Sequence, residues 1–259
     1  MNIFFDMRDA FRFWRVWATL AKFDIIKKYK RSLLGPWWIT LSTLVLILSI
    51  SLIYSVLLKV DISAYIINLS LNLIIWFLIR DSIIESCNSL IEARSFILNE
   101  KFNIIILSLR VIIRNFIIFL HNILIYIVII FYFSLDVNYF HLLISIFSLI
   151  FALVFLLPIC ISLSLICTRF RDIQMIINNI MQFLFFISPI LFSKQILLKF
   201  EWIILVNPIA LLLLTISEPV NLGITHFLYY QILFFYFLII SLMFFLIYRK
   251  FNSKITYWL

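Results

Sequence analysis

The stretch Lys27-Lys28-Tyr29-Lys30-Arg31-Ser32-Leu33-Leu34-Gly35-Pro36-Trp37-Trp38 marks the point at which this chain passes from water into a membrane. Four basic residues come before a Gly-Pro pair and two Trp residues, and an apolar run over residues 37–58 follows. That run is long enough to cross a bilayer, which takes about 20 residues at 1.5 Å each. Basic residues beside a span favour the cytoplasmic side, and Trp is enriched at membrane interfaces. This segment therefore predicts a first membrane-spanning helix that begins at the cytoplasmic face.

The composition extends this interpretation to the whole chain of 259 residues. Hydrophobic residues make up 65% and charged residues 13%, and the mean hydropathy is +1.17, which lies outside the range of soluble domains. The apolar runs lack the two-residue alternation of a membrane β-barrel. We therefore expect an all-α polytopic membrane protein. Cys87, Cys160 and Cys167 lack the spacing of a metal site and are expected to be packing residues.

Apolar runs predict six membrane spans, at about residues 37–58, 62–79, 104–133, 142–167, 173–192 and 227–248. Between the last two spans, apolar pieces too short to cross are interrupted by Pro208 and Pro219, which predicts two short re-entrant or outer helices. Nearly all of the 21 Lys and Arg residues then fall on the cytoplasmic side, the exceptions being Lys59, Lys194 and Lys199. The positive-inside rule thus places both termini in the cytoplasm. The net charge of +9 is explained by topology, so we expect no nucleic-acid partner.

Residues 8–25 carry two opposite stripes at helical spacing. One stripe is basic and polar and consists of Arg8, Arg12, Arg15, Thr19 and Lys22. The other is largely apolar and consists of Ala10, Trp14, Trp17, Ala21 and Ile25. This pattern is typical of an amphipathic helix lying in the membrane interface. An amphipathic helix docked on protein would show the same pattern and is the alternative.

Polar side chains recur on single faces of two predicted spans. Asn68 and Asn72 are four residues apart in the second span, where Asn usually bonds between helices, and lining of a polar path is the alternative. In the third span Arg110, Arg114 and His121 share one face. Ionisable groups at membrane depth are costly, so these must face protein, water or lipid headgroups.

The sequence lacks the motifs of several enzyme classes, including the phosphate loop, the HExxH zinc site and the GxSxG nucleophile turn. A passive pore, an ion-coupled carrier, an integral enzyme and the membrane half of an ATP-driven machine remain. Ion-coupled carriers typically have acidic or Gly/Pro-broken spans near the midplane. Here no Asp or Glu lies at a span centre, and only Pro158 and Pro189 fall within spans. This favours the ATP-driven machine.

Four segments spread along most of the chain form a set typical of one family: residues 29–38 with Leu41-Ser42, residues 114–122, residues 169–173 leading to Gln182 and residues 185–190, and Asn207-Pro208. With them, the chain resembles the permease subunits of polysaccharide ABC exporters of the ABC-2 type. The Arg114-Asn115 and His121-Asn122 pattern is most similar to the O-antigen or lipopolysaccharide export permeases. The resemblance implies that the chain moves a lipid-linked polysaccharide across the bacterial inner membrane.

The resemblance also implies the organisation of the chain and its partners. Residues 1–259 would form one ABC-2 type transmembrane domain, with an interface helix and basic segment at 1–36, six membrane helices at 37–248 and a cytoplasmic tail at 249–259. Two copies of the chain would pair as a homodimer with a separate ABC ATP-binding subunit. That subunit would bind ATP and Mg²⁺, so this chain is expected to be no enzyme and to hold no cofactor. The substrate would be an undecaprenyl-pyrophosphate-linked polysaccharide.

The basic segment is a candidate site for the substrate headgroup. Cations and interface aromatics converge there, and both suit a pyrophosphate at the membrane surface. The residues in this hypothesis are Lys28, Lys30, Arg31, Trp37 and Trp38. A plain positive-inside anchor is the alternative.

A sugar polymer needs a wide, hydrated channel with aromatic surfaces on which its rings can slide. The candidates for lining it lie on the fifth span and are Asn178, Gln182, Phe185 and Phe186. Ordinary packing of the two Phe side chains is the alternative.

The charged segment at residues 80–101 includes a helix-forming stretch between spans two and three. The family resemblance makes it a coupling helix, whose Glu92 and Arg94 would contact the ATPase. A merely solvated loop is the alternative.

Three other functions remain open from the sequence. A capsule or teichoic acid exporter and an ABC-2 small-molecule or lipid exporter would share the fold. An integral membrane enzyme of glycan assembly would need His, Asp or Glu residues converging at one membrane face. His121, His141 and His226 fall at different predicted depths, which disfavours the enzyme.

Overall fold

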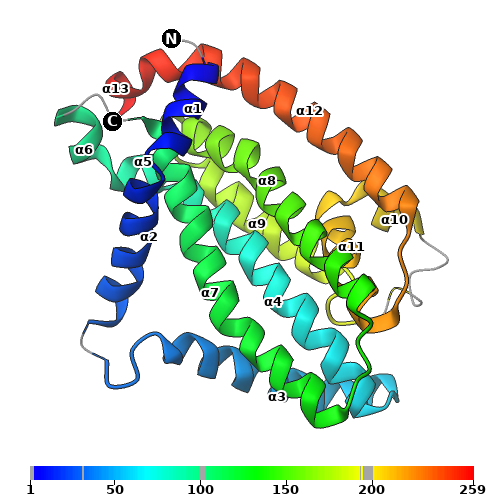
Figure 1. Cartoon of the computed structure of the whole chain (residues 1–259). Coiled ribbons are helices and arrows are strands. Elements are labelled where there is room, and N and C mark those ends of the chain that lie inside the picture. The colour runs from blue at the N-terminus through cyan, green and yellow to red at the C-terminus, as the bar shows by residue number, and fades with distance from the viewer. Residues whose placement is uncertain (1–2, 31, 100–102, 193, 195–200) are drawn as a thin grey trace.

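The computed structural model describes residues 3–30, 32–99, 103–192, 194 and 201–259, and most of these residues are helical (Figure 1). The helices in chain order are α1 (Ile3–Arg12), α2 (Trp14–Tyr29), α3 (Trp37–Leu58), α4 (Ile62–Ser86), α5 (Ser89–Glu92), α6 (Arg94–Asn99), α7 (Ile104–Phe133), α8 (Tyr139–Arg169), α9 (Ile173–Ile187), α10 (Glu201–Val206), α11 (Pro208–Leu222), α12 (Phe227–Phe251) and α13 (Ile255–Trp258). A short 3₁₀ turn joins α12 to α13.

Five helices in the described part of the chain are long and apolar enough to cross a membrane: α3, α4, α7, α8 and α12 with its continuation to Trp258. The structure thus confirms an all-α chain of multi-pass membrane character, and each of these helices lies on a predicted span. The fifth predicted span, residues 173–192, corresponds to α9, which has 15 residues and is about 22 Å long. α9 ends at Ile187 because Ser188 adopts the extended backbone that a following proline favours.

Side-chain caps fix where several helices begin. The side chains of Asn103 and Asn207 accept hydrogen bonds of 3.0 Å from backbone N–H groups in the first turns of α7 and α11. Asp61 caps α4 in the same way. The Ser63 hydroxyl donates to this exposed carboxylate, and that hydrogen bond lowers the pKa of Asp61 below its ordinary value.

Both chain termini lie at one end of the helix bundle, which we call the terminal end (Figure 1). Helices α1, α5, α6 and α13 also lie there, while the α3–α4, α7–α8 and α11–α12 connections lie at the opposite end. Tyr248 of α12 donates to the Asp6 carboxylate of α1 at 2.9 Å, and Asn103 donates to the Asp6 carbonyl at 2.6 Å. These bonds hold α1 against both α7 and α12.

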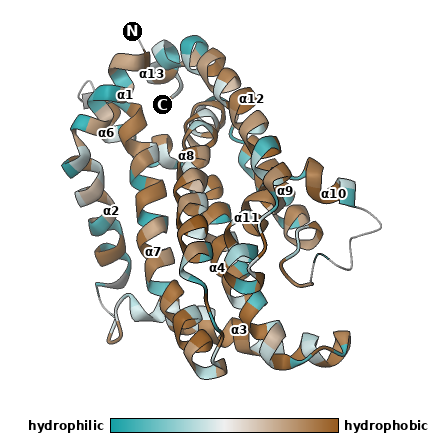
Figure 2. Cartoon of the chain, turned by 45° about the vertical axis from the view of Figure 1, so that its right-hand side comes forward, coloured by the Kyte–Doolittle hydropathy of each residue, from teal (hydrophilic) through white to brown (hydrophobic). Residues whose placement is uncertain are grey.

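Helix α4 is the centre of the bundle and packs against α3, α7, α8, α9 and α11. In its most apolar stretch 72% of the residues are buried, compared with 11% in α12. α3 and α12 instead expose many Leu, Ile and Phe side chains, and their ribbons are largely hydrophobic (Figure 2). These peripheral surfaces suit contact with lipid. The three cysteines are buried free thiols, which agrees with their predicted packing role.

The predicted N-terminal amphipathic helix is two helices, α1 and α2, separated at Phe13. α2 packs along α7, and Ala21 and Ile25 on it are buried. Trp14, which the sequence places on the same stripe, is 54% exposed. The side of α2 that carries Ala21 and Ile25 is therefore docked on protein, as the alternative interpretation of this helix predicts.

Helices α10 and α11 occupy the region where the sequence predicts two short helices. They meet at Asn207, whose side-chain amide also donates to the Ser188 hydroxyl at 2.9 Å just after α9. α11 packs against α4, α8 and α12, and nearly all of its residues are buried. The Asn207-Pro208 pair thus joins the end of α9 to the start of a buried helix.

Candidate functional site

A cluster of charges lies between α2, α4 and α7. Arg110 of α7 contacts Asp24 of α2 through two nitrogens, at 2.6 and 2.5 Å. Arg114, one turn further along α7, contacts Asp24 at 3.1 Å and Glu85 of α4 at 2.6 Å. The Asn115 side chain donates to the same Glu85 oxygen at 2.8 Å. Two cations and two anions therefore join three helices, and we call these five residues the charged cluster.

The charged cluster explains how α7 tolerates two arginines. The side chains of Arg110, Arg114 and Asp24 are only 16–19% exposed, so the two ion pairs of Asp24 are largely removed from water, whereas the Glu85 side chain is 37% exposed. Charges in such places need partners, and losing one partner leaves the other uncompensated. The sequence suggests that protein, water or headgroups face these arginines, and the structure identifies two carboxylates from distant segments.

The structure places the predicted headgroup residues around the turn between α2 and α3. Lys28 and Lys30 are exposed at the end of α2, and Arg31 lies outside the described residues. Trp37 and Trp38, the first residues of α3, are about half exposed, and the Trp37 ring lies 6.2 Å from the ring of His121 on α7. Gly35 has a φ of +56°, which glycine adopts without strain.

Helix α9 exposes the amide side chains that the sequence assigns to a channel. Asn178 and Gln182 are both exposed. Phe186 is 58% exposed, whereas Phe185 is half-buried and its ring centroid lies 5.5 Å from that of Trp76 on α4. The four residues therefore lie on one helix. Phe185 therefore packs against a neighbouring helix, as the alternative to the channel role predicts, whereas Phe186 is exposed.

The predicted coupling segment forms two short helices at the terminal end. Glu92 is the last residue of α5 and Arg94 the first of α6, and both side chains are exposed. Leu90, Ala93 and Ile97 are buried on the other side, so the segment is anchored to the bundle. The two charged residues are thus presented outward from a fixed base.

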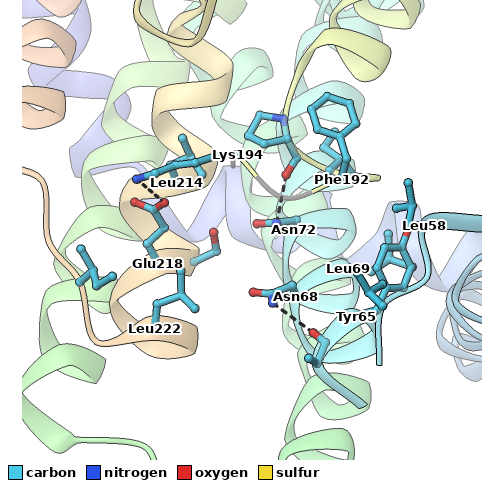
Figure 3. A pocket seen from close by; sticks show the side chains of 16 residues that line it. Leu58, Tyr65, Asn68, Leu69, Asn72, Phe192, Lys194, Leu214, Glu218 and Leu222 are labelled. Carbon is cyan, nitrogen blue, oxygen red and sulfur yellow. Dashed lines mark hydrogen bonds and ion pairs between the residues drawn. The ribbon is translucent and has the colours of Figure 1, made fainter. Parts of the chain in front are cut away.

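A cavity of about 600 Å³ lies between α4, α11 and the segment after α9, toward the opposite end of the bundle (Figure 3). Its walls are mainly apolar, and the polar or charged side chains among them include Asn68 and Asn72 from α4, Ser217 and Glu218 from α11, and Lys194. Lys194 contacts the Glu218 carboxylate at 2.8 Å and lies 2.7 Å from the His226 ring nitrogen. Glu218 is only 6% exposed and the Lys194 side chain 20% exposed, so the carboxylate is buried and the ammonium only partly so.

Amide and hydroxyl groups link the walls of the cavity. Asn221 of α11 donates to Asn68 at 2.9 Å, and Tyr126 of α7 donates to Asn221. Asn72 donates to the Pro189 carbonyl at 3.2 Å, across to the chain after α9. The α4 asparagines therefore bond between segments, the role that the sequence favours, and both also line the mainly apolar cavity.

The sequence interpretation did not assign a role to four of these charged residues. Asp24 is the single acid between residues 10 and 60, and that isolation beside basic residues was the available signal. Glu85 lies 13 residues past Asn72, near the end of α4. Glu218 interrupts the otherwise apolar α11, and Lys194 follows α9.

The chain matches no protein-family model and no curated protein sequence. What it does is therefore inferred from its membrane helices, the charged cluster, the exposed amides of α9 and the cavity.

Proposed function

We propose that this chain is the permease subunit of an ATP-driven exporter that moves a lipid-linked polysaccharide of the O-antigen type across the bacterial inner membrane. The observation that carries the proposal is helix α9, which exposes the amides of Asn178 and Gln182 beside Phe186. Amides facing hydrocarbon are costly, so α9 needs water or protein against this face. A hydrated path between two copies of the chain supplies both.

The path of the chain supports α9 as the fifth of six crossings. α8 ends at the terminal end of the bundle and α12 begins at the opposite end (Figure 1). The connection between them must cross the bundle an odd number of times, and α9 runs in that direction. In this topology α10 and α11 are the short helices on the outer side, and α11 enters the membrane without crossing it.

The charge distribution supports a cytoplasmic terminal end. Basic residues lie in α1, at the end of α8 and at the end of α12, whereas Lys59 and Lys194 lie toward the opposite end. The basic residues at the end of α2 lie away from the termini, at the turn before α3 (Figure 1). The exposed Glu92 and Arg94 belong to the terminal end and would meet a soluble ATPase, which binds ATP and Mg²⁺. Closure of the ATPase would then move α5 and α6 and, through them, α4 and α7.

The turn between α2 and α3 would receive the substrate. Lys28, Lys30 and Arg31 supply cations for a pyrophosphate, and Trp37 and Trp38 supply interface aromatics for the attached lipid. The sugar chain would follow along α9.

Co-purification tests this function directly. The chain is expressed with the ABC ATPase encoded beside it, and a tag on this chain alone is used for purification. A complex of two copies of each subunit, whose ATP hydrolysis responds to lipid-linked glycan, is the expected result. Loss of the ATPase during purification would contradict the exporter. Stimulation by small amphiphiles but not by the glycan would favour the small-molecule alternative.

A further inference from the structure

The cavity beside α4 and α11 has the dimensions of a ligand site. Its volume of about 600 Å³ falls within the range of small-molecule sites, about 300–1,000 Å³. Leu222, one of its lining residues, is 55% exposed, so the cavity is open to the surface. The cavity lies toward the end of the bundle opposite the termini, because its lining comes largely from the first turns of α4 and the last turns of α11 (Figure 1).

One wall of the cavity carries an acceptor without a partner. Asn72 is 7% exposed, and its amide nitrogen donates to the Pro189 carbonyl, which fixes the orientation of the amide. The amide oxygen is buried and has no hydrogen-bond partner among the described residues. It points away from α4 on the cavity side (Figure 3). A buried acceptor of this kind is unfavourable until a donor reaches it.

The wall formed by α11 offers a second acceptor. One carboxylate oxygen of Glu218 contacts Lys194 at 2.8 Å, while the other lies 3.7 Å from the His226 nitrogen, which is beyond hydrogen-bonding distance. The ion pair balances the charge of Glu218. Lys194 also lines the cavity, so the two charges there balance and attract neither an anion nor a cation. The cavity therefore suits an uncharged ligand that donates hydrogen bonds.

Aromatic rings complete the cavity. Tyr65 and Phe192 both line it, and the Tyr65 hydroxyl donates to the Leu191 carbonyl at 2.8 Å, which holds its ring in place. The face of an aromatic ring is electron-rich and attracts the C–H groups on one side of a sugar ring. Hydroxyl groups at the edge of the same sugar can donate to Asn72 and Glu218.

We propose that this cavity binds an uncharged sugar unit on the side of the membrane opposite the termini. The chemistry of the site is independent of the transport direction, but the source of the sugar, a glycan that has crossed the membrane, rests on the proposed exporter function. Such a site would hold the glycan at the exit and oppose its return.

Cysteine protection tests the sugar site in the full-length chain without the ATPase. Leu222 lines the cavity and is 55% exposed, so Leu222→Cys is open to a thiol reagent, whereas the native cysteines are buried. The protein is purified in detergent without a sugar headgroup and labelled with and without glucose, galactose, mannose or N-acetylglucosamine. At ten times its Kd, at least one of these sugars is expected to slow labelling by about tenfold.

Two matched variants give the test its specificity. Asp136→Cys, on the exposed α7–α8 connection at the same end, is expected to label at the same rate with and without sugar. Adding Asn72→Leu to Leu222→Cys removes the unpaired acceptor and is expected to abolish protection, while thermal unfolding checks that this variant is folded.

Three results separate the sugar site from the exporter. If no sugar protects Leu222→Cys, or if inorganic phosphate alone protects it, the sugar site is wrong even when the ATPase complex forms. If a sugar protects but no ATPase is retained, the site stands and the exporter fails. Protection that survives Asn72→Leu would overturn the assignment of this residue as the acceptor.

Discussion

The charged cluster and the cavity both contain ion pairs and asparagine side chains. They differ in whether every polar atom has a partner. In the charged cluster, Asp24, Glu85, Arg110 and Arg114 all have partners of opposite charge, and Asn115 adds a hydrogen bond. The cavity also has an ion pair, yet it keeps open volume and an unpaired acceptor. The comparison shows that pairing of every group holds helices together, whereas an unpaired group beside a hollow leaves room for a ligand.

Asp24→Asn is expected to have the largest effect on stability. It takes the carboxylate from Arg110 and leaves Arg114 with Glu85 alone. Removing one partner of a buried ion pair costs about 3–5 kcal/mol, and the partial exposure here places the expected loss near the lower end, about 3 kcal/mol. The free energy of unfolding is measured by dodecyl sulfate titration in mixed micelles.

Asp9→Asn is the matched control for Asp24→Asn, because Asp9 is an exposed acid on the neighbouring helix α1. Its effect is expected to stay within about 0.5 kcal/mol. Equal losses in the two variants would mean that the charged cluster does not hold α2 against the bundle.

Two Asn→Leu substitutions sharpen the comparison between the regions. Asn115→Leu removes a buried donor to Glu85 and is expected to cost about 1–3 kcal/mol. Asn72→Leu removes an acceptor that has no partner, and we expect a loss below about 1 kcal/mol because only the 3.2 Å bond to Pro189 is given up. The same titration measures both. A larger loss at Asn72 would show that the cavity is a structural element rather than a ligand site.

The extents of several membrane helices follow from the sequence because apolar length and basic flanks encode them locally. The first and third predicted spans have the same bounds as α3 and α7. The end of α9 before Pro189 and the start of α11 at Asn207-Pro208 also depend on neighbouring residues alone. Such features need no knowledge of the partner helices.

The two polar regions depend on packing between distant segments, and the sequence does not show that. Asp24 and Glu85 are far apart in the chain and meet only because α2 and α4 both pack on α7. Phe185 and Phe186 are identical neighbours in sequence, and only the position of Trp76 distinguishes them. From the sequence, both Phe residues are therefore expected to line the channel. Only the structure shows that one packs against Trp76 and the other is exposed.

Phe185→Ala and Phe186→Ala are expected to separate stability from transport. Phe185 packs on Trp76 of α4, so its truncation is expected to cost about 1–2 kcal/mol, below the loss for a fully buried Phe. Phe186 is exposed, and its truncation is expected to change stability by less than about 0.5 kcal/mol while lowering glycan export. Titration and export assays together measure the two effects. Unchanged export in Phe186→Ala would remove this ring from the proposed channel.

Charge reversal at the coupling segment is expected to have the smallest effect on stability. Glu92 and Arg94 lie at the same end as the termini, like many other basic and acidic side chains, but both are exposed. Glu92→Arg and Arg94→Glu are each expected to change the free energy of unfolding by less than about 0.5 kcal/mol, because water solvates either sign. ATP hydrolysis by the assembled complex is nevertheless expected to lose its response to glycan.

Comparing the charge reversals with Asp24→Asn distinguishes the effect of burial on stability from the effect of charge. All three substitutions change a charge on a helix that contacts α7 or lies beside one that does. Only Asp24→Asn disturbs ion pairs that are largely removed from water, those with Arg110 and Arg114. A loss of stability in Glu92→Arg or Arg94→Glu as large as in Asp24→Asn would mean that charge, rather than burial, decides which residues hold the helices. Intact stability with lost coupling would instead assign these exposed residues to a partner outside the chain.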